Sequence, residues 1–379
     1  MMERRIKISD FWMSCGTRKD GINWNILKLF LIMLMVISGF HSCTKDDKPL
    51  PPDNAANYSN GLVILNEGLF QQNNASLCFY SFSDSQVYTQ AFFTENGRGL
   101  GDTANDFETY ELDGETYIII AVDISSQIEI VEANSLKSVA QIPLFDGTAP
   151  REPRRIEVNG YAAYVCNFDG TVSVIDLTTY EVVKTISVGA NPDGMVQVGD
   201  ELYISNSGGL NFPVYDSTVS VIDMTTREVV DNIETRINCT KMIVDSQNEI
   251  YVLSNGNYSD IGPALLKIDP ITKQVVSTIN INTSAVEKVS DWIYYYDITS
   301  ETIRRFNMIS DTNESVELIN VSGYNTFSGM QYIEELQTLF CFDANGYVNA
   351  STIRAYNSAG VFQYEFGAEL NAKKISYND

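Results

Sequence analysis

Two nearly identical segments in the middle of the chain constrain its fold more than any other feature. Residues 170–183 read Gly-Thr-Val-Ser-Val-Ile-Asp-Leu-Thr-Thr-Tyr-Glu-Val-Val, and residues 217–230 read Ser-Thr-Val-Ser-Val-Ile-Asp-Met-Thr-Thr-Arg-Glu-Val-Val. Weaker copies occur on both sides, so the chain contains an internal repeat. The equivalent positions, spaced 38 to 51 residues apart, are Ser81, Glu132, Asp176, Asp223, Asp269, Asn307 and Asn357. Seven units of this length are typical of β-propeller blades.

Each repeat consists of short apolar runs bounded by turn residues, a pattern that predicts strands. The run at 117–122, Tyr-Ile-Ile-Ile-Ala-Val, is apolar on both faces, as a sheet between two other sheets requires. No stretch of the repeat region has convincing helical periodicity. The first unit begins with its second strand, at Leu62, whereas residues 371–379 resemble a first strand. We predict an all-β, seven-bladed β-propeller whose ring is closed by the C-terminal strand joining the N-terminal blade; a frayed tail is the alternative.

The first 42 residues differ from the repeat region and resemble a signal peptide. Basic residues precede an apolar stretch at 29–38 that is too short to span a bilayer. Cys43 follows the small residue Ser42, as at a bacterial lipoprotein cleavage site; a plain signal peptide with an incidental cysteine is the alternative. The predicted domains are a lipoprotein signal peptide at 1–42, a lipidated Cys43 with a flexible tether at 43–60, and the propeller at 61–379.

Charge and histidine content argue against several functional classes. The chain has 25 Lys and Arg residues against 49 Asp and Glu residues, a formal net charge of −24, which disfavours nucleic acid as a partner. Its only histidine, His41, lies in the predicted leader. A mature chain without histidine has no Ser-His-Asp or Cys-His catalytic centre and no His-ligated metal. We therefore expect no catalytic residues, and we expect that the protein is not an enzyme.

Acidic and cysteine residues do not form a metal-binding pattern. The residues nearest to a calcium site, without the ordered spacing of a calcium-binding loop, are Asp102, Asp106, Asp169 and Asp260. The cysteines of the repeat region are Cys78, Cys166, Cys239 and Cys341. Their spacing is not that of a metal site, and a disulfide among them stays open. We predict neither a metal nor a catalytic cofactor.

The connections between the predicted strands fall into two sets. Loops between the second and third strands of a blade emerge on the same face as the connections between blades, and the other turns emerge on the opposite face. The first set is long and rich in Asn, Gly, Tyr, Phe and Asp, as at 66–75, 95–106, 206–216, 254–263 and 343–349. Elaborate loops on one face of a rigid scaffold are where binding sites usually lie. Amides and flat aromatic rings suit a large polar ligand with apolar surfaces.

The candidate ligand-binding residues lie in or beside these loops. They are Asn66, Phe70, Arg98, Asp102, Asn105, Arg154, Asn167, Phe168, Asn206, Phe212, Tyr215, Asn255, Tyr258, Asp343 and Tyr347. The aromatic residues are either ligand contacts or local loop plugs, and the Asn and Asp residues either bind ligand or cap strand ends. The two arginines either meet an anionic ligand group or pair with neighbouring acids.

Several motifs resemble known families. Val-Ser-Val-Ile-Asp, Leu-Tyr-Ile-Ser-Asn and Gly-Ala-Asn-Pro-Asp-Gly resemble the YVTN-type seven-bladed propellers. More narrowly, the chain resembles Bacteroidetes surface lipoproteins of this fold at 65–68, 73–76, 97–105, 206–210 and 254–258. The acidic pair after Cys43 also looks like the signal that sends such lipoproteins to the cell surface. The resemblance covers roughly residues 60–379.

The resemblance implies a function. Lipoproteins of this kind capture cobalamin outside the cell and pass it to the outer-membrane TonB-dependent cobalamin transporter, over which they sit as a lid. We therefore expect a lipid-anchored, surface-exposed outer-membrane protein that binds cobalamin or related corrinoids as a ligand. A glycan- or protein-binding surface propeller without enzymatic activity is the alternative. An enzyme such as a lactonase or a quinone-dependent dehydrogenase is a third possibility, disfavoured by the lack of histidine.

Overall fold

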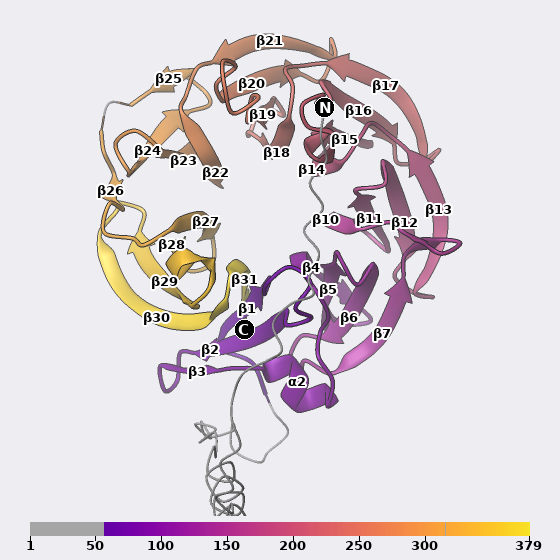
Figure 1. The fold of residues 1–379 in the computed structure, drawn as a ribbon, viewed down its shortest axis with the longest axis vertical. Coiled ribbons are helices and arrows are strands. Elements are labelled where there is room, and N and C mark those ends of the chain that lie inside the picture. Colours follow the sequence, from indigo (N-terminus) through magenta and orange to yellow (C-terminus); the bar gives the residue numbers. More distant parts are fainter. Residues whose placement is uncertain (1–56, 315) are drawn as a thin grey trace, which may run out of the picture. The chain divides into compact units, whose positions relative to one another are not determined.

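The computed structural model describes residues 57–379 except residue 315. Within this part, seven antiparallel sheets stand around a central axis as the blades of a propeller (Figure 1). The prediction of an all-β, seven-bladed propeller is confirmed. The predicted signal peptide, Cys43 and most of the tether lie outside the described residues. In the described part, no helix is long and apolar enough to cross a membrane.

The blades are numbered here along the chain, with strands given from the innermost outward. Blade 1 comprises β31 (Ala372–Asn378), β1 (Gly61–Asn66), β2 (Ser76–Ser81) and β3 (Gln86–Tyr88). Blade 2 comprises β4 (Ala104–Leu112), β5 (Glu115–Val122), β6 (Gln127–Glu132) and β7 (Ser138–Pro143). Blade 3 comprises β10 (Pro153–Asn159), β11 (Ala162–Asn167), β12 (Thr171–Asp176) and β13 (Glu181–Ser187). The two-residue strands β8 (Phe145–Asp146) and β9 (Ala149–Pro150) form a hairpin between blades 2 and 3.

The remaining four blades repeat this order. Blade 4 comprises β14 (Pro192–Val198), β15 (Glu201–Asn206), β16 (Thr218–Asp223) and β17 (Glu228–Glu234). Blade 5 comprises β18 (Cys239–Val244), β19 (Ile250–Ser254), β20 (Ala264–Asp269) and β21 (Gln274–Ile279). Blade 6 comprises β22 (Thr283–Val289), β23 (Trp292–Asp297), β24 (Thr302–Asn307) and β25 (Thr312–Asn313), with β26 (Ile319–Asn320) also pairing with β24. Blade 7 comprises β27 (Phe327–Ile333), β28 (Thr338–Asp343), β29 (Ala350–Asn357) and β30 (Phe362–Leu370).

The C-terminal strand closes the ring, as predicted. Strand β31 pairs antiparallel with β1, from Gly61 opposite Asn378 to Asn66 opposite Ala372. The buried Asn378 side chain donates hydrogen bonds to the carbonyl oxygens of Tyr58, at 2.6 Å, and Ala133, at 3.1 Å. Because the two ends of the repeat region complete one sheet, the inner edge of β1 is paired rather than open.

The repeat follows from packing between blades. In blade 3 the third strand, β12, has a buried centre whose two faces contact two neighbours: Ile175 packs in a cluster with Ile119 of blade 2, and Val174 packs in a cluster with Ile204 of blade 4. A strand enclosed on both faces needs a nearly continuous apolar run, because neither face meets water. β-branched residues suit such a surface.

The seven equivalent polar residues of the repeat each end the third strand of a blade. They are Ser81, Glu132, Asp176, Asp223, Asp269, Asn307 and Asn357. In blade 3, the Asp176 carboxylate accepts backbone N–H hydrogen bonds from Thr178, at 2.8 Å, and Thr179, at 3.3 Å. In blade 4, the Asp223 carboxylate accepts one from Thr226 at 2.7 Å. The side chain therefore stabilises the tight turn to the outer strand, which is why Asp or Asn recurs there.

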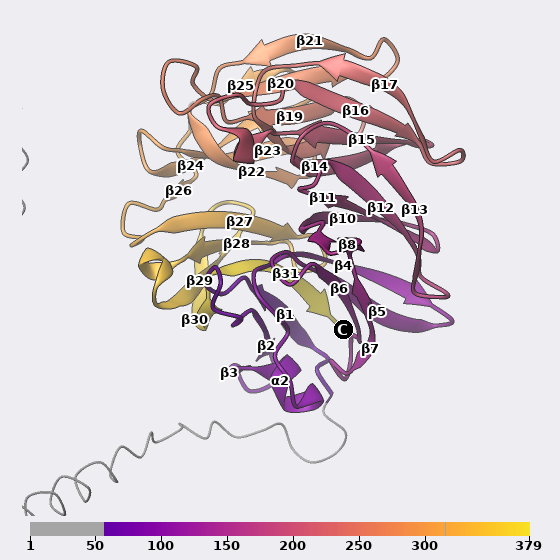
Figure 2. The same cartoon turned by 45° about the vertical axis from the view of Figure 1, so that its right-hand side comes forward.

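The sequence did not predict any α-helix in the propeller. A short helix, α2 (Ala91–Asn96), lies in the connection from blade 1 to blade 2, next to β2 and β3 at the outer part of blade 1 (Figure 2). Phe92 is 1% exposed and packs in the cluster with Phe79 and Leu136. A helix of this length has too few turns to give a periodic pattern, and it is stabilised by tertiary packing.

Connections differ on the two ends of the ring, as the sequence indicated. We call the end with the β1–β2, β15–β16, β19–β20 and β28–β29 loops the loop face; the connections between blades emerge there too. We call the other end the turn face. Its connections are short, such as 113–114 in blade 2 and 224–227 in blade 4, whereas the loop-face segments include 67–75, 89–103 and 207–217.

Candidate ligand-binding site

An irregularity in the innermost strands places side chains at the loop-face end of the central channel. In every blade the register between the inner strand and its neighbour shifts near the start of the inner strand. In blades 2, 3 and 4 the skipped residues are Asn105, Arg154 and Asp193. A bulge of this kind bends the strand and redirects a side chain. These three residues, which we call the bulge layer, meet across adjacent blades.

Arg154 is the centre of this layer. Its Nη1 lies 3.2 Å from Oδ2 of Asp123, and its Nε lies 3.6 Å from Oδ1 of Asp193. Its guanidinium carbon lies 4.3 Å from the centroid of the Phe168 ring. Two carboxylates therefore compensate the charge of Arg154, and the ring fixes its plane.

Asp123 is a buried partner of this layer. It is 4% exposed, and its Oδ2 also accepts a hydrogen bond of 2.7 Å from Nδ2 of Asn105. Burial raises the pKa of Asp123 to about 6, although the guanidinium of Arg154 acts in the opposite direction. The other oxygen, Oδ1, is buried and accepts no hydrogen bond from any residue that the structure describes. This oxygen leaves one strong acceptor unused beside the cavity described next.

A cavity of about 390 Å³ opens above this group on the loop face. Its apolar lining comes from Phe70, Ile124, Phe168 and Leu210. Its polar lining includes Arg154 together with Asp123, Glu67, Glu152 and Thr103. We call this space the rim cavity. Its volume and its mixture of apolar walls with a few convergent polar groups are typical of small-molecule sites.

An aromatic group extends the apolar surface beyond the rim cavity. The Phe212 and Tyr215 ring centroids are 6.1 Å apart, and those of Tyr215 and Tyr258 are 6.4 Å apart, in edge-to-face contacts. Phe212 is 71% exposed and Tyr258 is 74% exposed. We call these three residues the aromatic crest. Because Leu210 of the same 207–217 loop lines the rim cavity, the cavity and the crest share one loop.

Three of the predicted asparagines are held by hydrogen bonds within their own blade or to the adjacent one. Nδ2 of Asn167 donates to the Ser173 hydroxyl at 3.0 Å, and Nδ2 of Asn206 donates to the Ser220 hydroxyl at the same distance. Oδ1 of Asn66 accepts the backbone N–H of Glu369 at 3.0 Å. All three side chains are buried. They stabilise the ends of the second strands and thereby hold the loops that follow. Of the two roles predicted for these residues, ligand binding and capping of strand ends, their contacts are those of caps.

Asp343 has a similar role in blade 7. Its carboxylate accepts backbone N–H hydrogen bonds from Asn325, Thr326 and Asn345 and pairs with Arg354 at 3.2 Å. Although burial acts in the opposite direction, these hydrogen bonds hold the pKa of Asp343 below its usual value. The residue joins the connection from blade 6 to the loop after β28.

Two other predicted residues fix the connection between blades 1 and 2. Arg98 pairs with Glu129 of β6 at 2.7 Å and lies over the ring of Phe92. Asp102 accepts the backbone N–H groups of Gln71, at 3.0 Å, and Asn73, at 2.9 Å. Neither side chain lines the rim cavity. Arg98 therefore pairs with a neighbouring acid, and Asp102 ties the 67–75 loop to the connection that precedes β4.

The last two predicted residues lie at other places on the loop face. Nδ2 of Asn255 approaches the Thr240 hydroxyl at 3.4 Å. Tyr347 belongs to a 3-10 turn, η2 (Asn345–Tyr347), and is 50% exposed. Of the fifteen predicted residues, the structure brings Phe70, Arg154 and Phe168 together in the rim cavity and groups three more in the aromatic crest.

The sequence analysis missed the acids that hold Arg154. Asp193 lies in the Gly-Ala-Asn-Pro-Asp-Gly motif, which was noted only for its resemblance to other propellers. Asp123 directly follows the apolar strand β5, where several blades carry Asn or Asp near the strand end. Its place at a strand end, where other blades carry candidate residues, could have identified Asp123 as a candidate too. The pairing itself depends on the bulge at Arg154, which has no marker in the sequence.

The cysteine thiols of the propeller are inaccessible, and its acidic side chains form no metal-binding group within the described residues. The thiols of Cys78, Cys166, Cys239 and Cys341 are all buried, and within residues 57–379 no disulfide joins any two of them. Burial raises the pKa of Cys239 to about 11 and that of Cys166 to about 12. Within the described residues, no group of three or more His, Cys, Asp or Glu side chains is arranged to hold a metal ion.

Comparisons with known proteins give the family and the fold. No match was found among curated proteins. A solved structure from Bacteroides thetaiotaomicron, a quinonprotein alcohol dehydrogenase-like protein, is similar over 85% of this chain and 79% of that one, with a TM-score of 0.59 and 15% identity. The computationally designed Ika8 protein is similar over 73% of this chain and 91% of its own, with a TM-score of 0.50 and 10% identity. At these identities the likeness shows the propeller fold alone. The model of a family described as a domain of unknown function, DUF5074, matches residues 60–330, and the chain therefore belongs to that family.

Proposed function

We propose that this protein captures a large amphipathic small molecule on the loop face, that the ligand is a corrinoid such as cobalamin, and that no chemical step is involved. The observation that carries the proposal is that one loop, 207–217, contributes Leu210 to the rim cavity and Phe212 and Tyr215 to the aromatic crest. Together they offer apolar walls, exposed rings and hydrogen-bonding groups on one face of a rigid ring.

The shape and polarity of this surface suit a corrinoid. A corrinoid has a broad ring with apolar faces and peripheral carboxamides that donate and accept hydrogen bonds. The rim cavity, at about 390 Å³, receives one edge of such a ligand, and the aromatic crest supports the part that stays outside. The carboxylates of Glu67 and Glu152 are acceptors for carboxamide N–H groups.

Arg154 supports this binding mode through its neighbours rather than as an anion receptor. Its guanidinium already lies near Asp123 and Asp193, so an anionic ligand group would compete with two carboxylates. Its contact with Phe168 instead holds that ring in place as a wall of the cavity. The ligand is therefore held by stacking and hydrogen bonds. The propeller offers no histidine to the cobalt, because the single histidine of the sequence, His41, precedes residues 57–379.

The cellular role proposed is delivery. A lipid on Cys43 and the tether that follows would anchor the propeller to the outer membrane with its loop face available to a TonB-dependent transporter. Two features of the sequence support this part of the proposal: the lipoprotein-like cleavage site and the acidic pair that follows it. Labelling of intact cells with an antibody against the propeller, with and without permeabilisation, tests the exposure on the surface.

Calorimetric titration with cyanocobalamin tests the binding proposal. The purified chain is expected to bind, and Phe168→Ala and Phe212→Ala are expected to bind more weakly. The matched control is Ile271→Ala, because Ile271 is 91% exposed in a turn-face connection and is expected to leave binding unchanged. Absence of heat and of any mobility shift with cyanocobalamin rules the corrinoid proposal out.

A glycan is the second candidate ligand, because exposed aromatic rings such as Phe212 and Tyr258 also stack on sugars. A glycan array separates the two proposals. Binding to an oligosaccharide that is lost in Phe212→Ala, without binding to cyanocobalamin, favours the glycan-binding alternative. Binding to cyanocobalamin without any array signal favours the corrinoid.

A further inference from the structure

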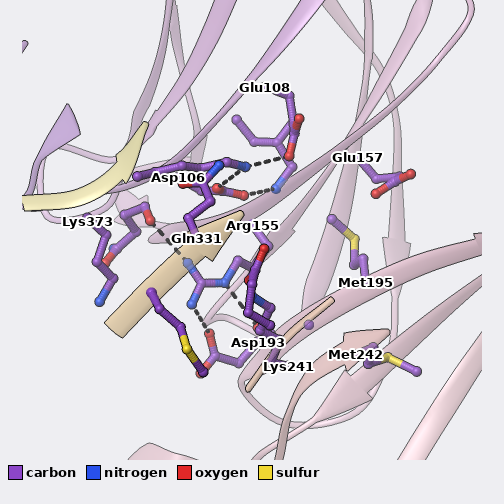
Figure 3. A pocket seen from close by; sticks show the side chains of 16 residues that line it. Asp106, Glu108, Arg155, Glu157, Asp193, Met195, Lys241, Met242, Gln331 and Lys373 are labelled. Carbon is purple, nitrogen blue, oxygen red and sulfur yellow. Dashed lines mark hydrogen bonds and ion pairs between the residues drawn. The ribbon is translucent and has the colours of Figure 1, made fainter. Parts of the chain in front are cut away.

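A second cavity lies inside the channel, below the bulge layer, and its polar groups are nearly all paired. It has a volume of about 390 Å³ and is lined by the innermost strands (Figure 3). Lys374 of β31 pairs with Asp106 at 2.8 Å and also with Glu108, and Lys241 of β18 pairs with Glu287. These ion pairs neutralise most of the charge in the channel.

Glu157 of β10 is the exception. Within the described residues its carboxylate forms no hydrogen bond and no ion pair, although the side chain lines the cavity; in Figure 3 no dashed line reaches it. Burial, and next the carboxylate of Glu108, raise the pKa of Glu157 to about 7, and only Lys374 acts in the opposite direction. A partly buried carboxylate with acidic neighbours attracts a cation.

Part of the lining of this cavity is apolar. Met195 of β14, Met242 of β18 and Met330 of β27 line the same cavity, together with Ile156. Methionine side chains are flexible and polarisable, and they adapt to the shape of a bound aliphatic chain. The cavity therefore combines one unpaired carboxylate with a wall that suits hydrocarbon rather than a hydrated metal ion.

The cavity has its own route to solvent. An adjoining space of about 290 Å³ is also lined by Glu157 and Met242, and beyond them by Val196 and Val244. These last residues lie toward the ends of β14 and β18 that lead to the turn face. A small molecule can therefore reach Glu157 from the turn face without passing the rim cavity.

We propose that the channel is a binding site for an organic ammonium ion with a short aliphatic stem, whose charged group pairs with the Glu157 carboxylate and whose stem packs on Met195 and Met242. Three observations carry this proposal: the unpaired carboxylate, the apolar side chains that line the same cavity and the adjoining space that leads toward the turn face. It does not depend on the identity of the ligand at the rim cavity.

Three probes with the same stem test this proposal on the purified chain. Titrations at pH 8, followed by calorimetry and ligand-observed NMR, compare n-butylamine, 1-butanol and butyrate. We expect n-butylamine to bind at least about tenfold more tightly than 1-butanol, because only the ammonium forms a charge-assisted hydrogen bond with Glu157, and butyrate not to bind. In Glu157→Gln the preference for the amine is expected to disappear.

Glu228→Gln is the matched control, since Glu228 is an exposed residue of the outer strand β17. It is expected to bind n-butylamine like the unmodified chain, and circular dichroism establishes that both variants are folded. Equal binding of n-butylamine and 1-butanol, or unchanged amine binding by Glu157→Gln, overturns the proposal. Displacement of the amine by millimolar calcium or magnesium ions also contradicts it, because the site would then be one for metal ions. Cyanocobalamin binding is measured separately, so a negative result at either site leaves the other test intact.

Discussion

The guanidinium carbon of Arg154 lies 4.3 Å from the ring centroid of Phe168, across two strands of the same blade. Arg154 occupies the bulge of β10, and Phe168 begins the loop after β11. The bulge turns Arg154 toward the mouth of the channel, where it also meets acids from the two adjacent blades. One irregularity of a single residue thus couples three blades to one wall of the rim cavity.

Replacing Arg154 with Met is expected to lower the free energy of unfolding by about 3 kcal/mol, because Asp123 would remain buried without its cation. The double variant Arg154→Met with Asp123→Asn is expected to recover part of this loss. Urea denaturation of the two single variants and the double variant measures the coupling. Simple additivity of the two effects would contradict the pairing.

Truncating the aromatic crest is expected to affect binding and not folding. Tyr258→Ala should change the free energy of unfolding by less than about 0.5 kcal/mol, because the ring is 74% exposed. The affinity for cyanocobalamin should fall by about tenfold through loss of stacking area. Calorimetry and urea denaturation on the same preparation check both statements, with Ile271→Ala as the control. A large loss of stability would show that the ring is a loop plug.

Closure of the ring is expected to depend on Asn378. Its side-chain amide donates two hydrogen bonds to buried carbonyl oxygens of Tyr58 and Ala133, and Asn378→Ala leaves them without that donor. We expect a loss of about 1–3 kcal/mol in the free energy of unfolding. Gln363→Ala, in an exposed part of β30, is the control and should be nearly neutral. Equal midpoints of urea denaturation for the two variants would contradict this role.

Ionisation of Glu157 is expected to lower the free energy of unfolding of the propeller as the pH rises. Its pKa is about 7 in the folded chain against an ordinary value of 4.5, so between these pH values the folded state holds the proton more often than the unfolded state. Rising pH in this window therefore favours unfolding, and the penalty is complete above pH 7. Relative to Glu157→Gln, the unmodified chain should lose stability from pH 5 to pH 7.5. The groups acting on this carboxyl are Glu108, Asp106 and Lys374. A parallel pH profile for the two proteins is the contrary result.

The cysteines of the propeller are expected to be unreactive until the chain unfolds. Cys78, Cys166, Cys239 and Cys341 are buried, and burial raises the pKa of the last three. A thiolate is needed for alkylation, so iodoacetamide at pH 8 should not modify them in the folded chain. Mass spectrometry before and after denaturation in urea measures the modified sites. Rapid labelling of any of the four without urea would contradict the buried placement.

Much of the fold could be predicted from local patterns because each blade repeats the same physical requirement. A sheet enclosed by two others needs apolar third strands, and the tight turn after each needs a side-chain acceptor such as Asp176 or Asp223. These requirements recur at a regular interval and are visible without coordinates. Helix α2 was missed because its six residues are stabilised by contacts of Phe92 with distant residues.

The candidate site could be predicted only in part. Loop length and composition located the face, and the structure brings three of the fifteen candidates, Phe70, Arg154 and Phe168, together in one cavity. Asn167 and Asn206 were indistinguishable from ligand contacts in sequence, because a capping amide and a binding amide are the same residue type. Their hydrogen bonds to Ser173 and Ser220 became evident only from the packing of the strands.

By itself, the sequence determined the number of blades, the order of strands and the face that carries the long loops, because these depend on periodic patterns and on the lengths of segments. The tertiary structure decided which side chains meet. Asp123, Arg154 and Asp193 come from three blades and are joined by strand bulges, and Glu157 stays unpaired because the cations of the channel face other acids. Such relationships depend on distances between residues far apart in the chain, and no local pattern encodes them.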